Sequence, residues 1–123
     1  MQRTGSAEIG QEGERLAVEW LRAHGYMILE RNWRSGRYET DIIALNGDIV
    51  HFVEVRTRSV RGLLSPEETV TPDKCRSLFR CASAYLATYG RGLEPQFDLI
   101  AVDMFPDGGY DIRYVENAMQ SHW

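Results

Sequence analysis

The chain of 123 residues has only two cysteines, and their placement argues against both a disulfide between them and a zinc site. Cys75 and Cys81 are six residues apart in one predicted helix, so their side chains point in different directions. Neither belongs to a CxxC pair or has a histidine nearby, which argues against a zinc site. We therefore expect two buried, reduced thiols and no disulfide.

Long apolar runs are also missing. None approaches the roughly 20 residues that a membrane-spanning helix requires, and the N-terminus lacks the apolar core of a secretory signal. We therefore expect no membrane partner and a cytoplasmic location. The length and the 43% of hydrophobic residues suit one domain over residues 1–123, with a core from about residue 8 to residue 116.

Basic residues do not predominate either. The net charge of −4 argues against a strongly electropositive nucleic-acid binder, because neutralising phosphates supplies most of such a protein's affinity. The charge is uneven, however: residues 1–30, 31–91 and 92–123 carry −2, +3 and −5. Thirteen of the basic residues are arginine, and Lys74 is the only lysine. A locally positive field is therefore expected in the middle of the chain.

Hydrophobic periodicity and turn residues predict the element order α-β-β-β-α-β-β. A helix is expected from Glu8 to His24, and a second helix begins with Thr71 as N-cap and Pro72 as its first residue and ends at Gly90. Strands are expected at residues 26–33, 38–45, 49–57 and 96–105, and an edge strand at 110–115. Residues 58–70 are expected to form a loop that borders a cleft. This order predicts an α/β fold with a mixed central sheet flanked by helices.

Asn46-Gly47 is the strongest hairpin signal, because both residues tolerate the positive φ angles of a type I′ turn. A two-residue turn there sets Glu39 opposite Glu54 and makes Asp41 a diagonal neighbour of Glu54. Because alternate residues of a strand share a face, these three carboxylates and Arg56 project to one side. A three-residue loop would move Asp41 to the other face, so the placement depends on the turn.

Carboxylates gathered on one face repel each other, and burying them unpaired is unfavourable. A hard cation such as Mg²⁺ resolves this, since it is typically held by one or two carboxylates together with phosphate oxygens. Such an ion activates a bound water for phosphodiester hydrolysis, and Arg56 can hold the phosphate. In the alternative interpretation, Glu39 and Glu54 form salt bridges on a solvated face with Arg37, Arg56 or Arg58. The pattern alone leaves both interpretations open.

One arrangement resembles the PD-(D/E)XK nuclease signature, whose superfamily has an α-β-β-β-α-β core. It consists of Asp41, twelve intervening residues and then Glu54-Val55-Arg56. Further motifs resemble the YraN-like proteins, a family of predicted endonucleases related to archaeal Holliday junction resolvases. These motifs are Gly10–Ala17, Glu30–Arg34, Glu39–Ala44, Phe52–Arg58, Val70-Thr71 with Lys74, and Phe97-Asp98. The resemblance implies a restriction endonuclease-like fold and a metal-dependent endonuclease that hydrolyses phosphodiester bonds of DNA, including branched DNA in recombination or repair. It also implies Mg²⁺ or Mn²⁺ as cofactor and, by analogy, a homodimer.

The family pattern, carried onto this sequence, makes Asp41 and Glu54 metal ligands, with the Val55 carbonyl as a third. Glu14 becomes an accessory ligand or a water-orienting acid, although an acid near a helix N-terminus is also explained by the helix dipole. Three further residues become accessory or substrate-binding positions, namely Glu39, Arg34 and Arg58.

The chain departs from the signature at Arg56, where the pattern has lysine. Arginine stays protonated and cannot act as a general base, but it can hold phosphate. Lys74 can supply the missing amine from the start of the second helix. Three functional hypotheses follow. The first is a Mg²⁺-dependent endonuclease that uses Arg56 or Lys74, and the second is a catalytically inactive nucleic-acid-binding or adaptor module with a nuclease-like fold. The third is a protein-interaction domain whose acidic hairpin has no catalytic meaning.

Overall fold

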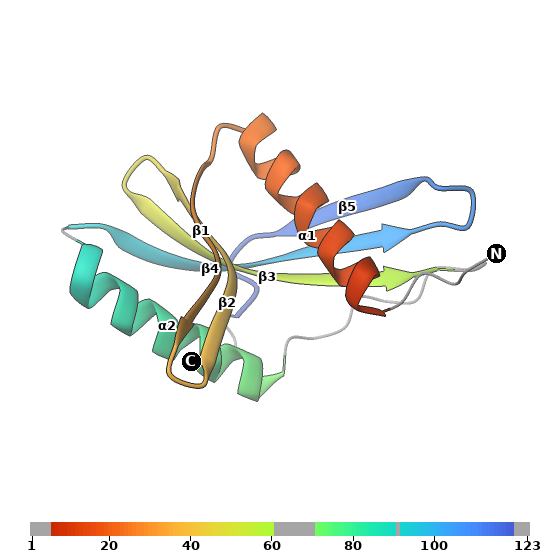
Figure 1. The fold of residues 1–123 in the computed structure, drawn as a ribbon. Helices are drawn as coiled ribbons and strands as arrows, with labels where there is room; N and C mark the ends of the chain where they lie inside the picture. The colour runs from red at the N-terminus through yellow and green to blue at the C-terminus, as the bar shows by residue number, and fades with distance from the viewer. Residues whose placement is uncertain (1–5, 61–70, 91, 120–123) are drawn as a thin grey trace.

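The computed structural model describes residues 6–60, 71–90 and 92–119, and side chains from residue 8 onward within these ranges. The elements confirm the predicted order α-β-β-β-α-β-β (Figure 1). They are α1 (Ser6–Ala23), β1 (Met27–Ser35), β2 (Tyr38–Asn46), β3 (Ile49–Ser59), α2 (Pro72–Tyr89), β4 (Glu94–Met104) and β5 (Tyr110–Val115). Among the described residues there is no helix with the length and apolar character needed to cross a membrane.

The five strands form one mixed sheet in the order β1-β2-β3-β4-β5. β3 and β4 are parallel, and all other neighbours are antiparallel. Parallel strands require a crossover connection, and α2 lies in the connection between β3 and β4. β5 is an edge strand, as predicted.

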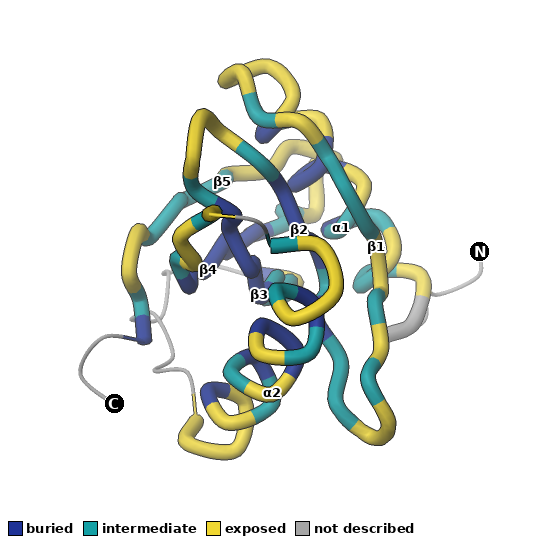
Figure 2. The backbone as a smooth tube through the Cα atoms, turned by 90° about the vertical axis from the view of Figure 1, so that its left-hand side faces the viewer, coloured by how far each residue is buried: buried dark blue, intermediate teal, exposed yellow. Residues whose placement is uncertain are grey.

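The two helices cover opposite faces of the sheet (Figure 1), and the apolar residues form a separate core on each face. The core under α1 contains Leu21, Ile42 and Val53, whereas the core under α2 contains Phe52 and Leu78. Figure 2 shows that burial concentrates in the central strands β2, β3 and β4. Because neighbouring strand residues point to opposite faces, the residues next to Ile42 and Val53 point toward the α2 side.

α2 begins as the sequence predicts. Thr71 has an extended backbone (φ −68°, ψ 155°), and its side chain accepts a hydrogen bond from the Lys74 backbone N–H at 3.2 Å. Pro72 follows in the first helical turn. Cys75 and Cys81 are buried free thiols, which confirms that prediction. The cap fixes Lys74 in the first turn of α2.

β3 is longer than predicted. It continues to Ser59, so Arg58 belongs to this strand and not to the predicted loop. The reason is the parallel partner β4, which pairs with β3 over its whole length. The rest of the predicted loop 58–70, from residue 61 to residue 70, lies outside the described residues.

Candidate active site

β2 and β3 separate part-way along their length. Their pairing ends at Ile42 and Val53; beyond this pair β2 continues beside β1, and β3 continues beside β4. Figure 1 shows the resulting fork, in which the β1–β2 hairpin turns away while β3 runs on beside β4. Asp41 and Glu54 are the first residues beyond the last pair, so both lie where the sheet divides.

The hairpin between β2 and β3 turns one residue later than predicted. Its turn residues are Gly47-Asp48 and not Asn46-Gly47. Gly47 has a φ of 63° and neither neighbour has a positive φ, which is the pattern of a type II′ turn, not of type I′. Counting outward, Asp41 lies directly opposite Glu54, where the predicted register made them diagonal. The pairing changes by two residues, so both side chains keep the predicted face.

Asp41 and Glu54 are carboxyl groups enclosed at the fork. Asp41 Oδ2 accepts a hydrogen bond from the Val55 N–H at 2.8 Å, and Glu54 is only 5% exposed. Burial, with the nearby Glu54 charge, raises the pKa of Asp41 to about 7, and burial also raises the pKa of Glu54. The N–H and C=O of one strand residue point to the same neighbour, so the Val55 carbonyl also faces the gap. A cation between these oxygen atoms would relieve the repulsion.

Two basic side chains reach this carboxylate pair. Lys74 Nζ, from the first turn of α2, lies 3.5 Å from Glu54 Oε1, and its side chain is 52% exposed. Arg56 follows Glu54 on the same face of β3. Burial is the largest influence on the pKa of Glu54, and the charges of Lys74 and Arg56 oppose it. Both cations therefore act on the same carboxylate.

Glu14 reaches the site from α1. A Cβ on the preceding Gly13 would lie 1.8 Å from Thr57 Oγ1, so only a glycine lets α1 approach β3 this closely. Asn32 Nδ2 donates a hydrogen bond to Glu14 Oε2 at 3.3 Å. The Glu14 charge also contributes to the raised pKa of Asp41, after burial and the Glu54 charge. α1 thus brings a third carboxylate to the gap.

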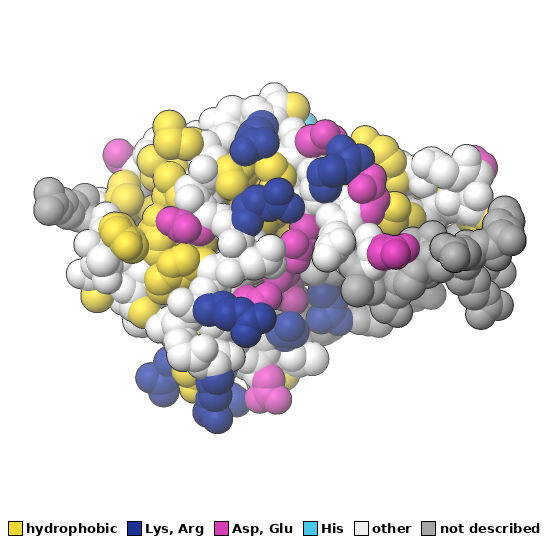
Figure 3. Space-filling model, viewed as in Figure 1, with side chains coloured by type: hydrophobic (Ala, Val, Ile, Leu, Met, Phe, Trp, Pro, Cys, Tyr) yellow, Lys and Arg dark blue, Asp and Glu magenta, His cyan; other side chains and the backbone are white. Residues whose placement is uncertain are grey.

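The residues that the sequence proposed for catalysis line one pocket of about 320 Å³. Its lining comprises Gly10, Glu14, Asp41, Glu54, Val55, Arg56, Thr57 and Lys74. On the face shown in Figure 3, a group of acidic side chains lies between α1 and α2 with Lys and Arg side chains around it. The fold therefore gathers residues from α1, β2, β3 and α2 around one cavity.

The donor atoms at the fork suit a hard cation. Side chains alone do not complete a metal site, because residues 8–60, 71–90 and 92–119 contain no cluster of three or more His, Cys, Asp and Glu side chains able to hold a metal ion. The protein's share would be the two carboxylates of Asp41 and Glu54 and the Val55 carbonyl. Mg²⁺ and Mn²⁺ prefer oxygen ligands, and Mg²⁺ usually keeps several waters beside one or two carboxylates. This donor set therefore fits either ion.

The three accessory positions have partners of their own. Arg34 and Glu39 form an ion pair across the β1–β2 hairpin, with 2.9 Å between Nη2 and Oε2. Glu39 also lines a second pocket together with Asp41, Glu54 and Lys74. A salt bridge at Glu39 was one of the two predicted interpretations, although its partner here is Arg34. Arg58 donates from Nε to Asp103 Oδ1 at 2.8 Å.

Asn32 is a site residue that the sequence analysis missed. Its φ of 51° lies in the left-handed region, which residues other than glycine rarely adopt, and its side chain contacts Glu14. The available signal was an asparagine inside an expected strand, because asparagine tolerates positive φ better than most residues. That signal indicates an irregular backbone, but it does not indicate which residue the side chain contacts.

Comparison with known proteins finds a family match over most of the chain. A model described as "Uncharacterised protein family UPF0102" matches residues 13–102. A UPF0102 protein of Symbiobacterium thermophilum is 43% identical over 117 residues, covering 94% of this chain and 99% of the relative. UPF0102 proteins of Chlorobaculum parvum (46% over 99 residues; 76% and 74% covered) and Bacteroides thetaiotaomicron (38% over 111 residues; 90% and 91% covered) are also similar. The matched region extends from before Glu14 to beyond Lys74.

Proposed function

This chain belongs to the uncharacterised protein family UPF0102, and we propose that it is a metal-dependent endonuclease that hydrolyses phosphodiester bonds of DNA. One observation carries the proposal: the half-buried carboxylate of Asp41 and the buried carboxylate of Glu54 lie opposite each other at a fork in the sheet, and Lys74 lies beside Glu54. The resemblance of these positions to the PD-(D/E)XK signature supports the same chemistry and a restriction endonuclease-like fold.

Asp41, Glu54 and the Val55 carbonyl would hold Mg²⁺ or Mn²⁺, which supplies a Lewis acid that activates water and neutralises phosphate charge. The protein orients both carboxylates in advance. The Val55 N–H holds Asp41, and the Lys74 ammonium lies beside Glu54. Preorganised groups of this kind need little rearrangement when charge develops in the reaction.

The basic residues at the pocket then have different parts. Lys74 can orient the attacking water or donate to a phosphate oxygen, because its ammonium has three donors and lies 3.5 Å from Glu54 Oε1. Arg56 stays protonated, so it holds the phosphate and stabilises negative charge without moving a proton. Glu14 can accept a hydrogen bond from a water on the α1 side of the pocket.

Arg56 also favours a second candidate function, because it occupies the position where the signature has lysine. In this candidate the chain binds nucleic acid, or acts as an adaptor, without hydrolysing it. The two candidates differ in one measurement: the module leaves DNA intact with Mn²⁺, and it still does so when Arg56→Lys restores the signature residue.

The endonuclease proposal predicts that Asp41→Asn and Glu54→Gln abolish metal-dependent DNA cleavage. Each change removes one negatively charged ligand while keeping the size of the side chain, so we expect a rate at least about a hundredfold lower. Cleavage of labelled linear and branched DNA with Mg²⁺ or Mn²⁺ measures this. Chelation of the metal should stop the reaction of the unchanged protein.

Asp48→Asn is the matched control. It makes the same chemical change in the same hairpin, but Asp48 is exposed in the turn. We expect its cleavage rate to equal that of the unchanged protein. Equal cleavage by Asp41→Asn and Asp48→Asn, or no cleavage of either DNA by the unchanged protein, contradicts the proposed function.

A further inference from the structure

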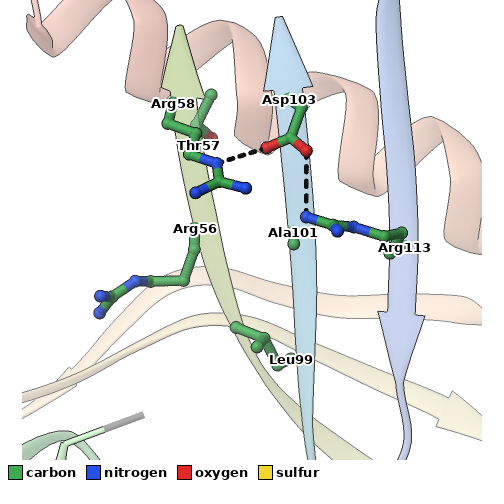
Figure 4. Close-up of a pocket in the computed structure, with 7 residues that line it drawn as sticks. All are labelled: Arg56, Thr57, Arg58, Leu99, Ala101, Asp103 and Arg113. Atoms are coloured by element: carbon green, nitrogen blue, oxygen red, sulfur yellow. Dashed lines mark hydrogen bonds and ion pairs between the residues drawn. The ribbon is translucent and has the colours of Figure 1, made fainter. Parts of the chain in front are cut away.

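A further hollow of about 270 Å³ adjoins the pocket that holds Asp41 and Glu54 (Figure 4). It is lined by Arg56, Thr57, Arg58, Leu99, Ala101, Asp103 and Arg113. Arg56 and Thr57 line both cavities, so the two are neighbours along β3. Three of these lining residues are arginines, and Asp103 is the one carboxylate among them. The hollow is therefore an arginine-rich extension of the carboxylate site.

Asp103 holds two of these arginines in place. It is 1% exposed in β4; its Oδ1 accepts from Arg58 Nε at 2.8 Å, and its Oδ2 accepts from Arg113 Nη2 at 3.0 Å. β4 lies between β3 and β5, so this clamp draws one guanidinium from each side over the middle strand. Figure 4 shows both groups pointing at Asp103, whereas Arg56 points away from it. One bond to Asp103 sets the direction of the other donors of each planar group.

The floor of the hollow is small and apolar. In the sheet register Ala101 lies beside Arg56 of β3 and Arg113 of β5, and Leu99 is the next residue of β4 on this face. A larger side chain at position 101 would fill the space between the arginines. The side chains of Arg58 and Arg113 are 28% and 35% exposed, so solvent reaches both. The arrangement is an accessible hollow with two oriented guanidinium groups.

We propose that Arg58 and Arg113, together with Arg56, bind backbone phosphates of the DNA strand that flank the phosphate cleaved at the fork. Oriented guanidinium groups suit phosphate because they donate two parallel hydrogen bonds. Arg56 and Arg58 are two residues apart on β3, so their Cα atoms are separated by about 7 Å. This separation suits neighbouring phosphates of one DNA strand. The inference rests on the proposed function for its ligand, and it gives Arg113 a binding role.

The first test measures the affinity for a short fluorescent DNA strand, with Ca²⁺ in place of Mg²⁺, over a range of salt concentrations. Arg113→Gln should raise Kd about three- to tenfold and reduce the slope of log K against log salt by about one. Arg22→Gln is the control, because it removes the same charge from an exposed position in the last turn of α1. It should change neither quantity.

Arg113→Gln also removes a contact to Asp103 and can lower stability, so a second variant leaves the clamp intact. Ala101→Glu places a carboxylate in the hollow, where it competes with phosphate. If the hollow binds anions, this variant has a higher melting temperature and a weaker DNA affinity than the unchanged protein. Unchanged DNA binding by both variants, an unraised melting temperature for Ala101→Glu, or an unchanged protein without salt-dependent affinity overturns the proposal.

The outcomes separate this proposal from the proposed function. If the protein binds DNA and Arg113→Gln reduces the salt slope, but DNA stays intact with Mg²⁺ and Mn²⁺, the endonuclease proposal fails and the phosphate subsite stands. If DNA is cleaved and Arg113→Gln binds and cleaves like the unchanged protein, the phosphate subsite fails alone.

Discussion

Lys74 and Arg56 approach Glu54 from different elements and differ in chemistry. The ammonium of Lys74 is a compact charge on a flexible stem, 3.5 Å from Glu54 Oε1, in the first turn of α2. The guanidinium of Arg56 is planar and permanently charged, and it extends from the strand that carries Glu54. In the proposed endonuclease the compact charge of Lys74 would orient the attacking water, and the planar guanidinium of Arg56 would bind phosphate.

This division predicts different effects for the two residues. Lys74→Met should lower kcat about a hundredfold or more with little change in KM, because it removes a group that acts on the reacting water. Arg56→Gln should instead raise KM in addition to any loss in kcat, because it removes a phosphate contact. Steady-state cleavage kinetics measure both quantities.

Arg76→Met is the control for Lys74→Met, since Arg76 is exposed on the same helix and pairs with Asp73. It should leave both kinetic constants unchanged. Wild-type kcat in Lys74→Met would return the catalytic role to Arg56.

Individual residues of the site were predictable to different degrees. Asp41 and Glu54 follow from strand alternation, and Lys74 from being the only lysine. Arg113 could not be found, because its proposed role depends on pairing between β4 and β5 and on the hollow beside Arg56. The contact of Asn32 with Glu14 could not be found either, because it depends on the positive φ of Asn32. Local patterns therefore identified the carboxylates, but not residues whose position depends on strand pairing or on an irregular backbone.

At the scale of elements, the β2–β3 hairpin shows why a wrong turn still gave the right face. Moving the turn from Asn46-Gly47 to Gly47-Asp48 changes the pairing by two residues, and side chains alternate with a period of two. The fork itself was not predictable, because it arises where β2 keeps its partner β1 while β3 keeps β4. Such competition between distant pairings leaves no local signal.

The contact between α1 and β3 predicts that Gly13→Ala destabilises the protein and reduces cleavage. An added methyl group would overlap Thr57, so α1 must move away from β3 and carry Glu14 with it. We expect a loss of about 1–3 kcal/mol in the free energy of unfolding, typical of overpacking. Thermal unfolding and cleavage assays measure the two effects.

Gly10→Ala is the matched control for stability. It lies one turn earlier in α1, and a Cβ there meets nothing within 4 Å. We expect its melting temperature to be equal or higher, since alanine favours a helix by about 1 kcal/mol over glycine. Equal melting temperatures for the Gly10 and Gly13 variants would show that the close approach of α1 has no energetic importance.

At the scale of the whole molecule, a buried polar network joins β3, β4 and β5. Asp98 is fully buried; its Oδ2 lies 2.6 Å from His51 Nδ1 and accepts from the Tyr114 hydroxyl, and its Oδ1 accepts from the Asn117 N–H at 2.9 Å. Burial alone would raise the pKa of Asp98, but the hydrogen bonds led by His51 and Tyr114 hold it below its usual range.

A lowered pKa in the folded state predicts acid sensitivity. The stabilisation by the Asp98 carboxylate is fully present above its unfolded pKa of about 3.9 and is lost as pH falls through the lower folded value. Asp98→Asn should therefore cost about 2–4 kcal/mol near neutral pH and progressively less in acid. Urea unfolding from about pH 3 to about pH 7 measures the difference.

Asp111→Asn is the control for this series, because Asp111 is exposed on β5. Its stability should follow that of the unchanged protein at every pH. A gap between Asp98→Asn and the unchanged protein that stays constant in acid would contradict the assignment of acid sensitivity to this carboxylate.

The fork also determines what limits the width of the opening that a DNA strand would enter. Beyond Ile42 and Val53 the gap is bridged by the side chain of Asp41, which accepts the Val55 N–H. A carboxylate can release such a bond when it takes up a proton or turns to another ligand, whereas a strand ladder breaks only with the sheet. The gap can therefore widen while β2 and β3 stay paired near the hairpin turn, and the hydrogen bond to the Val55 amide sets its narrowest width.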